Sequence, residues 1–174
     1  LISVARLVLS DYFCLPADQV NAPYRPLPAG LVTSGEVIGL SVVLTILGLV
    51  TAALLNVRAL LFAVVVGVVG FLYNWRLKRT GLLGNLMVSF SVGMTFVFGG
   101  VAVGQPFQRL VWFFAVIGML VDLGEEIAAD ALDMEGDRQM GSRSLALVWG
   151  RKPALRLSGG LFLAFMATIN PGDE

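Results

Sequence analysis

The sequence predicts an all-α fold, a multi-pass transmembrane helical bundle. Two observations indicate this fold: the apolar composition and the long apolar runs. Of the 174 residues, 57% are hydrophobic and 14% are charged, and the mean hydropathy is +0.84. A soluble domain of this length carries more charge, so we expect the chain to lie in a membrane. We expect residues 1–174 to form one partial domain, a fragment of a larger protein, because the chain begins without methionine.

The first thirty residues combine a short apolar segment with a proline-rich one. Residues 1–10 are too short to cross a bilayer, which takes about 20 helical residues, and they are predicted to be the end of a helix. Residues 11–30 contain four prolines, which favour extended or turn conformations in the residues before them. We therefore expect an ordered polar loop at 11–30, not a span.

Apolar runs of suitable length then predict the membrane spans. The first two are joined by a connection of three residues, which predicts a tight helical hairpin. The fifth reaches span length if its helix begins near Pro153. About five spans are expected: Val37–Leu55, Ala59–Tyr73, Leu83–Val103, Leu110–Leu123 and Leu157–Ile169.

Counting these crossings places the three polar segments 11–30, 76–79 and 125–141 on one side of the membrane. The loops of the opposite side offer Arg58 and Arg109 as their basic residues, whereas the shared side is rich in arginine and lysine. Because positive charge concentrates in cytoplasmic loops, we expect the shared side to be cytoplasmic.

The stretch 122–141 holds most of the acidic residues. In a helix, Glu126, Asp130, Asp133 and Asp137 fall at i, i+4, i+7 and i+11, on one face. Like charges so placed repel one another, and Mg²⁺ reverses that effect because it prefers carboxylate and phosphate oxygens. A solvated acidic loop is the plain alternative. Against it, ionisable groups beside membrane spans are expensive and tend to mark functional paths.

A second, weaker acidic signal lies near the N-terminus. Asp11 and Asp18 are seven residues apart, with Cys14 between them. Such aspartates often cap helices or initiate turns, and this reading stays open. Their expected place on the same membrane side favours a second function, because two facing carboxylate clusters can clamp metal ions bridged by a diphosphate.

The remaining polar candidates each have two readings. Arg76–Arg79 is either a set of positive-inside anchors or a cationic wall for diphosphate oxygens. Tyr73 is an interface residue or a hydrogen-bond donor, and Asn21 and Arg25 lie in a stiff segment that can position them for a ligand. The sequence has one cysteine and no histidine. This excludes a disulfide framework and a cysteine-built zinc site and leaves carboxylates, amines and metal for chemistry.

Three segments carry a family resemblance. SDYFCLPADQVNAPYRPLPAG (Ser10–Gly30), YNWRLKRTGLLGNLMVSFSVGMTFVFGG (Tyr73–Gly100) and DALDMEGDRQMGSRSL (Asp130–Leu145) are similar to the two Asp-rich motifs and the basic loop of the UbiA-type intramembrane prenyltransferases. The segments look most like the digeranylgeranylglyceryl phosphate synthase branch of that family. Ser10 stands where the family has asparagine, and Cys14 where it has a metal-facing aspartate.

The resemblance implies a nine-helix fold, Mg²⁺ as cofactor and a set of site residues. Glu125 and Glu126 are weaker candidates than the aspartates. The implied catalytic residues are Asp18, Asp133 and Asp137, the implied metal ligands are Asp11, Asp18, Asp130, Asp133 and Asp137, and the implied diphosphate-binding residues are Asn21, Arg25, Tyr73, Lys78, Arg79 and Arg143.

The activity that the resemblance implies is Mg²⁺-dependent transfer of a prenyl group, favoured as geranylgeranyl, from its diphosphate to a membrane-embedded acceptor. The favoured acceptor is geranylgeranylglyceryl phosphate, in ether-lipid synthesis, and an aromatic quinone precursor or a tetrapyrrole is the alternative. A transporter or a non-catalytic membrane subunit is the alternative from another class. The expected partners are the isoprenoid diphosphate, the lipophilic acceptor and the bilayer, with no nucleic acid.

Overall fold

The computed structural model describes residues 1–77, 80–139 and 141–169. These residues form eight α-helices and one π-helical turn, with no strand in the described ranges. In chain order the elements are α1 (Ile2–Asn21), α2 (Ser34–Leu55), α3 (Val57–Leu72), the π-helical turn η1 (Tyr73–Leu77), α4 (Leu82–Ala102), α5 (Arg109–Leu132), α6 (Met134–Gln139), α7 (Leu145–Trp149) and α8 (Arg151–Ile169).

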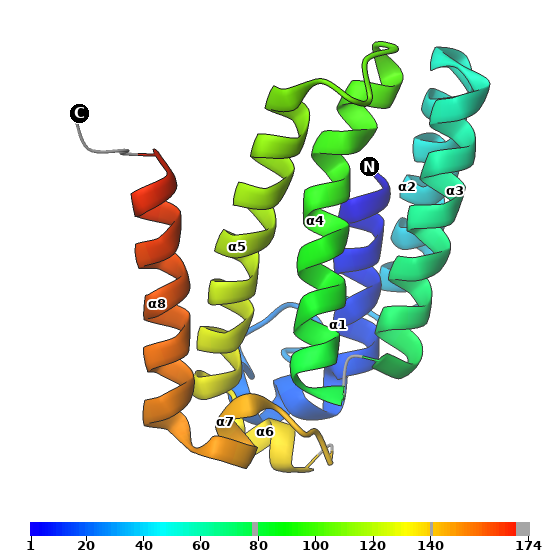
Figure 1. Ribbon diagram of the computed structural model, residues 1–174. Coiled ribbons are helices and arrows are strands. Elements are labelled where there is room, and N and C mark those ends of the chain that lie inside the picture. The colour runs from blue at the N-terminus through cyan, green and yellow to red at the C-terminus, as the bar shows by residue number, and fades with distance from the viewer. Residues whose placement is uncertain (78–79, 140, 170–174) are drawn as a thin grey trace.

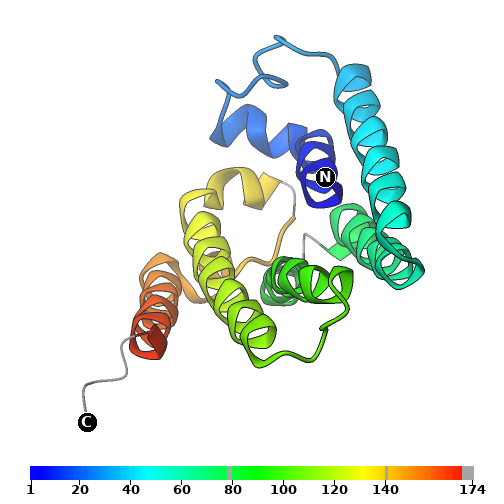
Figure 2. The ribbon, with the colours of Figure 1, turned by 90° about the horizontal axis from the view of Figure 1, so that it is seen from above.

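The long helices lie side by side, and the short helices α6 and α7 lie at one end of them (Figure 1). α4 lies between α3 and α5, α1 packs against α2, and α8 packs on the outer side of α5 (Figure 2). This arrangement confirms the predicted all-α helical bundle. Its large apolar side chains are mostly exposed, as expected of helices that face lipid.

Three helical segments of the described chain are long and apolar enough to cross a membrane: Ser34–Leu55, Val57–Leu77 and Leu82–Ala102. They correspond to the first three predicted spans. The fourth and fifth predicted spans are also helical, as α5 and α8. Both carry charged residues, and their crossing of the membrane stays a prediction.

The predicted hairpin is present and turns at one residue, Asn56. Its backbone is extended, its side chain accepts a hydrogen bond from the N–H of Ala59, and its N–H bonds the carbonyl of Ala52. Asn56 therefore ends α2 and caps α3. Its Nδ2 also donates to the carbonyl of Ala102 at 3.3 Å, which ties the hairpin to the end of α4.

The prediction of a loop from residue 11 is wrong, because α1 continues to Asn21 with Pro16 inside it. A proline within a helix removes one N–H donor, here the partner of the Tyr12 carbonyl. Both Tyr12 and Pro16 are exposed, and the helix passes this point without ending. Asp11, Cys14 and Asp18 are thus held on a rigid helix, and the turn reading of these aspartates no longer applies.

The acidic stretch is helical, but it is not the single helix that the spacing predicts. α5 ends at Leu132, Asp133 adopts a non-helical conformation (φ −94°, ψ 15°), and α6 begins at Met134. Glu126 and Asp130 therefore belong to α5, and Asp137 belongs to α6. The spacing i to i+11 does not describe one continuous face, and a turn in the backbone brings Asp137 back toward the bundle.

The described parts of the three polar segments lie at one end of the bundle, the polar end, as the crossing count predicts. The end of α1, the start of α4 and the helices α6 and α7 are together at the lower end of Figure 1, whereas the turn between α2 and α3 and the loop between α4 and α5 are at the upper end. The cytoplasmic assignment of the lower end stays a prediction.

The contact of α4 with α5 depends on a glycine. A Cβ on Gly93 would lie 2.4 Å from the Cγ of Met119 and 2.8 Å from the carbonyl oxygen of Ala115. Small residues allow such close approach of helices in lipid.

We expect Gly93→Ala to lower the thermal unfolding temperature of the purified protein, because α5 must move away. Gly99→Ala is the matched control on the same helix, with nothing within 4 Å of its Cβ; an equal loss in both variants would contradict this account.

Candidate active site

A cavity of about 570 Å³, the acidic cavity, lies among α1, η1, α4, α5 and α6. It brings together residues from both acidic segments. Among the described residues, six carboxylates and two guanidinium groups line it: Asp11, Asp18, Glu126, Asp130, Asp133, Asp137, Arg6 and Arg25. This surplus of negative charge at one place is the main electrostatic feature of the site.

The α1 wall carries Asp11, Cys14 and Asp18, and Arg25 reaches back to it from the following loop. Nη1 of Arg25 donates to both carboxylate oxygens of buried Asp18, at 3.0 and 3.2 Å, and lies 3.9 Å from Asp11. Partial burial works against the charge of Arg25, but the carboxylates of Asp18, Asp11 and Asp133 outweigh burial and raise its pKa. Arg25 therefore stays charged between the two acidic segments.

The opposite wall is formed by α5, α6 and the residue between them. The carboxylate of Asp130 accepts a hydrogen bond of 2.8 Å from Nδ2 of Asn85, a buried residue at the start of α4. This bond fixes the direction of the Asp130 side chain. Glu126, the weaker candidate from the sequence, also lines the cavity, whereas Glu125 is exposed and does not.

Asn21 joins the two walls. Its Nδ2 donates to the carbonyl of Asp133 at 3.0 Å, and its Oδ1 accepts from the N–H of Gly136 at 2.9 Å. A Cβ on Gly136 would lie 2.4 Å from Nδ2 of Asn21 and 2.8 Å from the carbonyl oxygen of Ala17. The side-chain amide thus holds the end of α1 against the start of α6. Its role as a direct diphosphate ligand stays a prediction.

The other sequence candidates are placed as follows. Tyr73 is buried in η1 and lines the cavity. Arg143 is exposed and adjoins the lining residue Ser142 without lining the cavity itself. Lys78 and Arg79 lie outside the described residues.

The donor set suits a metal ion that arrives with phosphate. Among the described residues there is no group of three or more acidic or cysteine side chains close enough to hold a metal ion alone. Magnesium is commonly bound by one or two carboxylates, water and substrate phosphates. Asp11 and Asp18 on one wall, and Asp130, Asp133 and Asp137 on the other, supply such carboxylates around a shared space. The residues present fit this kind of site.

Sequence reasoning missed polar residues that lie inside the apolar helices. Asn85 orients Asp130, and Arg6 and Asn74 line the cavity. The signal was present, because a polar or charged residue within an apolar helix is uncommon and usually has a partner. Arg6 was included in a short helix end, and the two asparagines were included in or beside the spans without a role.

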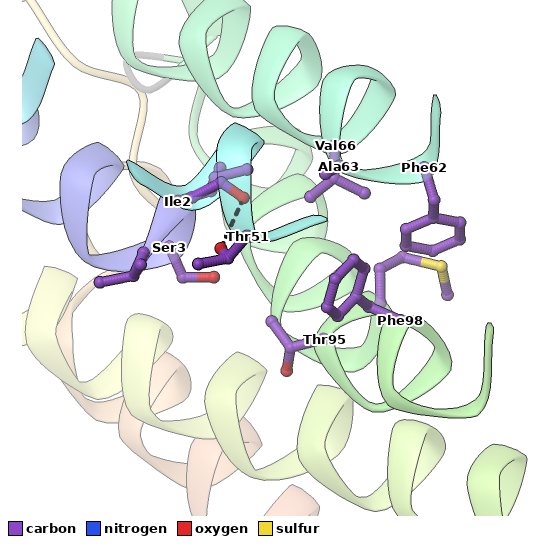
Figure 3. A pocket seen from close by; sticks show the side chains of 11 residues that line it. Ile2, Ser3, Thr51, Phe62, Ala63, Val66, Thr95 and Phe98 are labelled. Atoms are coloured by element: carbon purple, nitrogen blue, oxygen red, sulfur yellow. Dashed lines mark hydrogen bonds between the residues drawn. The ribbon is translucent and has the colours of Figure 1, made fainter. Parts of the chain in front are cut away.

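Two smaller cavities continue into the apolar interior. The nearer one, of about 140 Å³, shares Arg6 and Asn74 with the acidic cavity. The farther one, of about 220 Å³, is lined by the first residues of α1 and by apolar side chains, with Phe62 and Phe98 close together (Figure 3). The acidic cavity therefore has apolar surroundings on the side away from the polar end.

Comparison with known proteins agrees with this arrangement. The chain is 37% identical over 163 residues to a digeranylgeranylglyceryl phosphate synthase of Methanopyrus kandleri, a match that covers 94% of this chain and 59% of the relative. It is 33% identical over 163 residues to the protein of the same name from Pyrococcus furiosus, covering 93% of this chain and 58% of that one. The chain thus spans less than two thirds of the length of these relatives.

A solved structure shares the fold. It is described as "Structural and mechanistic insights into the biosynthesis of Digeranylgeranylglyceryl phosphate synthase in membranes" and matches with a TM-score of 0.66 and 33% identity, over 94% of this chain and 58% of that one. Residues 1–171 match the UbiA prenyltransferase family. With both acidic motifs in one cavity of a helical membrane bundle, the chain belongs to the UbiA prenyltransferase family.

Proposed function

We propose that the full-length protein transfers a prenyl group from its diphosphate to a lipid acceptor in the membrane. The observation that carries this proposal is the gathering of two acidic segments, more than a hundred residues apart in sequence, around one cavity at the polar end of an apolar bundle. A diphosphate with an isoprenoid tail has the matching chemistry, because its charged head binds cations held by the carboxylates and its tail needs an apolar surface.

In this proposal Asp11, Asp18, Asp130, Asp133 and Asp137 hold Mg²⁺, with Asp18, Asp133 and Asp137 as the catalytic carboxylates. When bound, Mg²⁺ supplies positive charge to the diphosphate oxygens as the allylic carbon–oxygen bond breaks. Tyr73 and Asn21 face the same cavity and bind or position the head. The cationic residues assigned to the leaving diphosphate are Arg25, Lys78, Arg79 and Arg143, whose charge favours the separated state.

The donor and acceptor are proposed from the relatives. Both relatives described above are named digeranylgeranylglyceryl phosphate synthase. We assign geranylgeranyl diphosphate as donor and the hydroxyl of geranylgeranylglyceryl phosphate as acceptor, which gives an ether lipid. The polar end, with Arg25, Arg138 and Arg143, is assigned to the cytoplasmic side.

Membranes that carry the full-length protein test the reaction directly. We expect labelled geranylgeranyl diphosphate to give product with geranylgeranylglyceryl phosphate in the presence of Mg²⁺, and none after chelation with EDTA. Product formed with a quinone precursor or chlorophyllide, and not with geranylgeranylglyceryl phosphate, would show that the proposed acceptor is wrong. The absence of Mg²⁺-dependent product with all three acceptors would contradict the proposed function.

A pair of variants in α6 tests the acidic site. Asp137 lines the cavity, whereas Glu135 is exposed and pairs with Arg138 at 3.3 Å on the surface. We expect Asp137→Asn to lower kcat about 100-fold, the scale seen when one group that stabilises developing charge is removed. Glu135→Gln removes one negative charge from the same helix and should leave kcat within a factor of about two. Both variants are measured at equal thermal stability, which excludes a folding defect. An equal loss of kcat in Asp137→Asn and Glu135→Gln would then contradict a specific role of Asp137 in the site.

A substitution at Cys14 tests whether an added carboxylate strengthens metal binding. It lies on the α1 wall between Asp11 and Asp18 and faces the cavity. Cys14→Asp adds a carboxylate there, so we expect half-maximal activity at a several-fold lower Mg²⁺ concentration, whereas Cys14→Ser should not change that concentration. An unchanged Mg²⁺ requirement in Cys14→Asp would show that the α1 wall does not hold the metal in the way proposed.

A further inference from the structure

An arginine lies inside the bundle at the inner end of the acidic cavity, and an aspartate of another helix lies within electrostatic range of it. Arg6 of α1 lines both the acidic cavity and the adjoining cavity of about 140 Å³. Asp122 of α5 lies within electrostatic range of Arg6. Nη1 of Arg6 and Oδ2 of Asp122 are both buried, and neither has a hydrogen-bond partner among the described residues.

The stem of Arg6 is held in place by the neighbouring helix. A Cβ on Gly70 of α3 would lie 2.7 Å from the Cδ of Arg6, so the side chain passes where α3 has no side chain of its own. The Nδ2 of Asn74 donates to the backbone carbonyl of Arg6 at 2.8 Å, and the Oδ1 of Asn74 is itself buried without a hydrogen-bond partner. Packing therefore directs the guanidinium toward the two cavities.

A purely structural ion pair would have its atoms in direct contact. Burying a charged donor without a partner costs free energy, and so does burying an unpaired carboxylate oxygen. Arg6 and Asp122 attract each other, and Ser89 is a hydrogen-bond partner of the Asp122 carboxyl group, yet Nη1 of Arg6 and Oδ2 of Asp122 remain without a partner. Ionisable groups that persist inside a membrane bundle in this way tend to mark ligand paths.

The position of Arg6 matches one part of a prenyl diphosphate. Arg6 precedes Asp11 by five residues on α1, about 7.5 Å along the axis at the rise of an α-helix and away from the polar end. Ile2 of α1 and Val66 of α3 lie farther from the polar end than Arg6 does, and their apolar side chains line the next cavity. The guanidinium thus lies between the carboxylates and the apolar interior, where a diphosphate head is joined to its tail.

We propose that Arg6 is a further substrate-binding residue, which donates hydrogen bonds to phosphate oxygens at the tail end of the diphosphate, and that the charge of Asp122 holds its guanidinium there by electrostatic attraction. This inference rests on the proposed function and adds a fixed cation that is independent of metal. The planar guanidinium can donate two hydrogen bonds to phosphate oxygens, and its positive charge helps to keep the diphosphate bound in the site.

Binding of inorganic pyrophosphate with Mg²⁺ to the purified full-length protein in nanodiscs, followed by calorimetry, tests the inference without requiring transfer. We expect Arg6→Gln to weaken binding about 10- to 100-fold, the scale of one charge-assisted hydrogen bond. Arg6→Lys keeps the charge, so its affinity for pyrophosphate should lie between those of the unaltered protein and Arg6→Gln. Arg58→Gln, which removes an exposed arginine at the far end of the bundle, should bind like the unaltered protein.

The double variant Arg6→Gln/Asp122→Asn separates binding from structure. If Arg6 binds phosphate, the double variant recovers the thermal stability that Arg6→Gln loses, because no unpaired charge is left buried, but it does not recover the affinity for pyrophosphate. Recovery of affinity in the double variant, unchanged affinity in Arg6→Gln, or no binding of pyrophosphate by the unaltered protein would overturn the inference. Arg6-dependent binding without prenyl transfer would instead overturn the proposed function and leave Arg6 as a phosphate ligand.

Discussion

The hydrogen bonds of one side-chain amide determine how the two acidic segments meet. Asn21 at the end of α1 bonds the carbonyl of Asp133 and the N–H of Gly136, and Gly136 has no room for a side chain at this contact. Both bonds go to backbone atoms at the break between α5 and α6. The break therefore has a fixed geometry, and Asp133 and Asp137 are presented to the same cavity as Asp11 and Asp18.

This geometry has an electrostatic cost that the bundle only partly compensates. The carboxylates of two walls share one cavity in apolar surroundings, where like charges repel more strongly than in water. Arg25 offsets Asp18 through two contacts, and Asn85 gives Asp130 a donor. A site with this excess of negative charge has its highest affinity for a ligand that brings cations, which is the physical reason for proposing a metal diphosphate.

The sequence predicted the features that depend on long patterns and missed those that depend on single residues. The apolar runs placed α2, α3 and α4 to within a few residues, and the crossing count brought the polar segments to one end. The continuation of α1 through Pro16 and the break at Asp133 were missed, because each is decided by packing against a distant segment. Arg6 and Asn85 were missed because their partners, Asp122 and Asp130, lie on another helix.

The order of charges along α1 gives the proposed ligand a direction. Arg6 lies at the inner end, Asp11 and Asp18 follow toward the polar end, and Arg25 contacts them from the loop beyond. A diphosphate whose tail pointed to the polar end would place an apolar chain among carboxylates and its charged head against Ile2 and Val66. With its tail inward, the head lies between two guanidinium groups and beside the aspartates, so one helix fixes both the place and the orientation of the reacting bond.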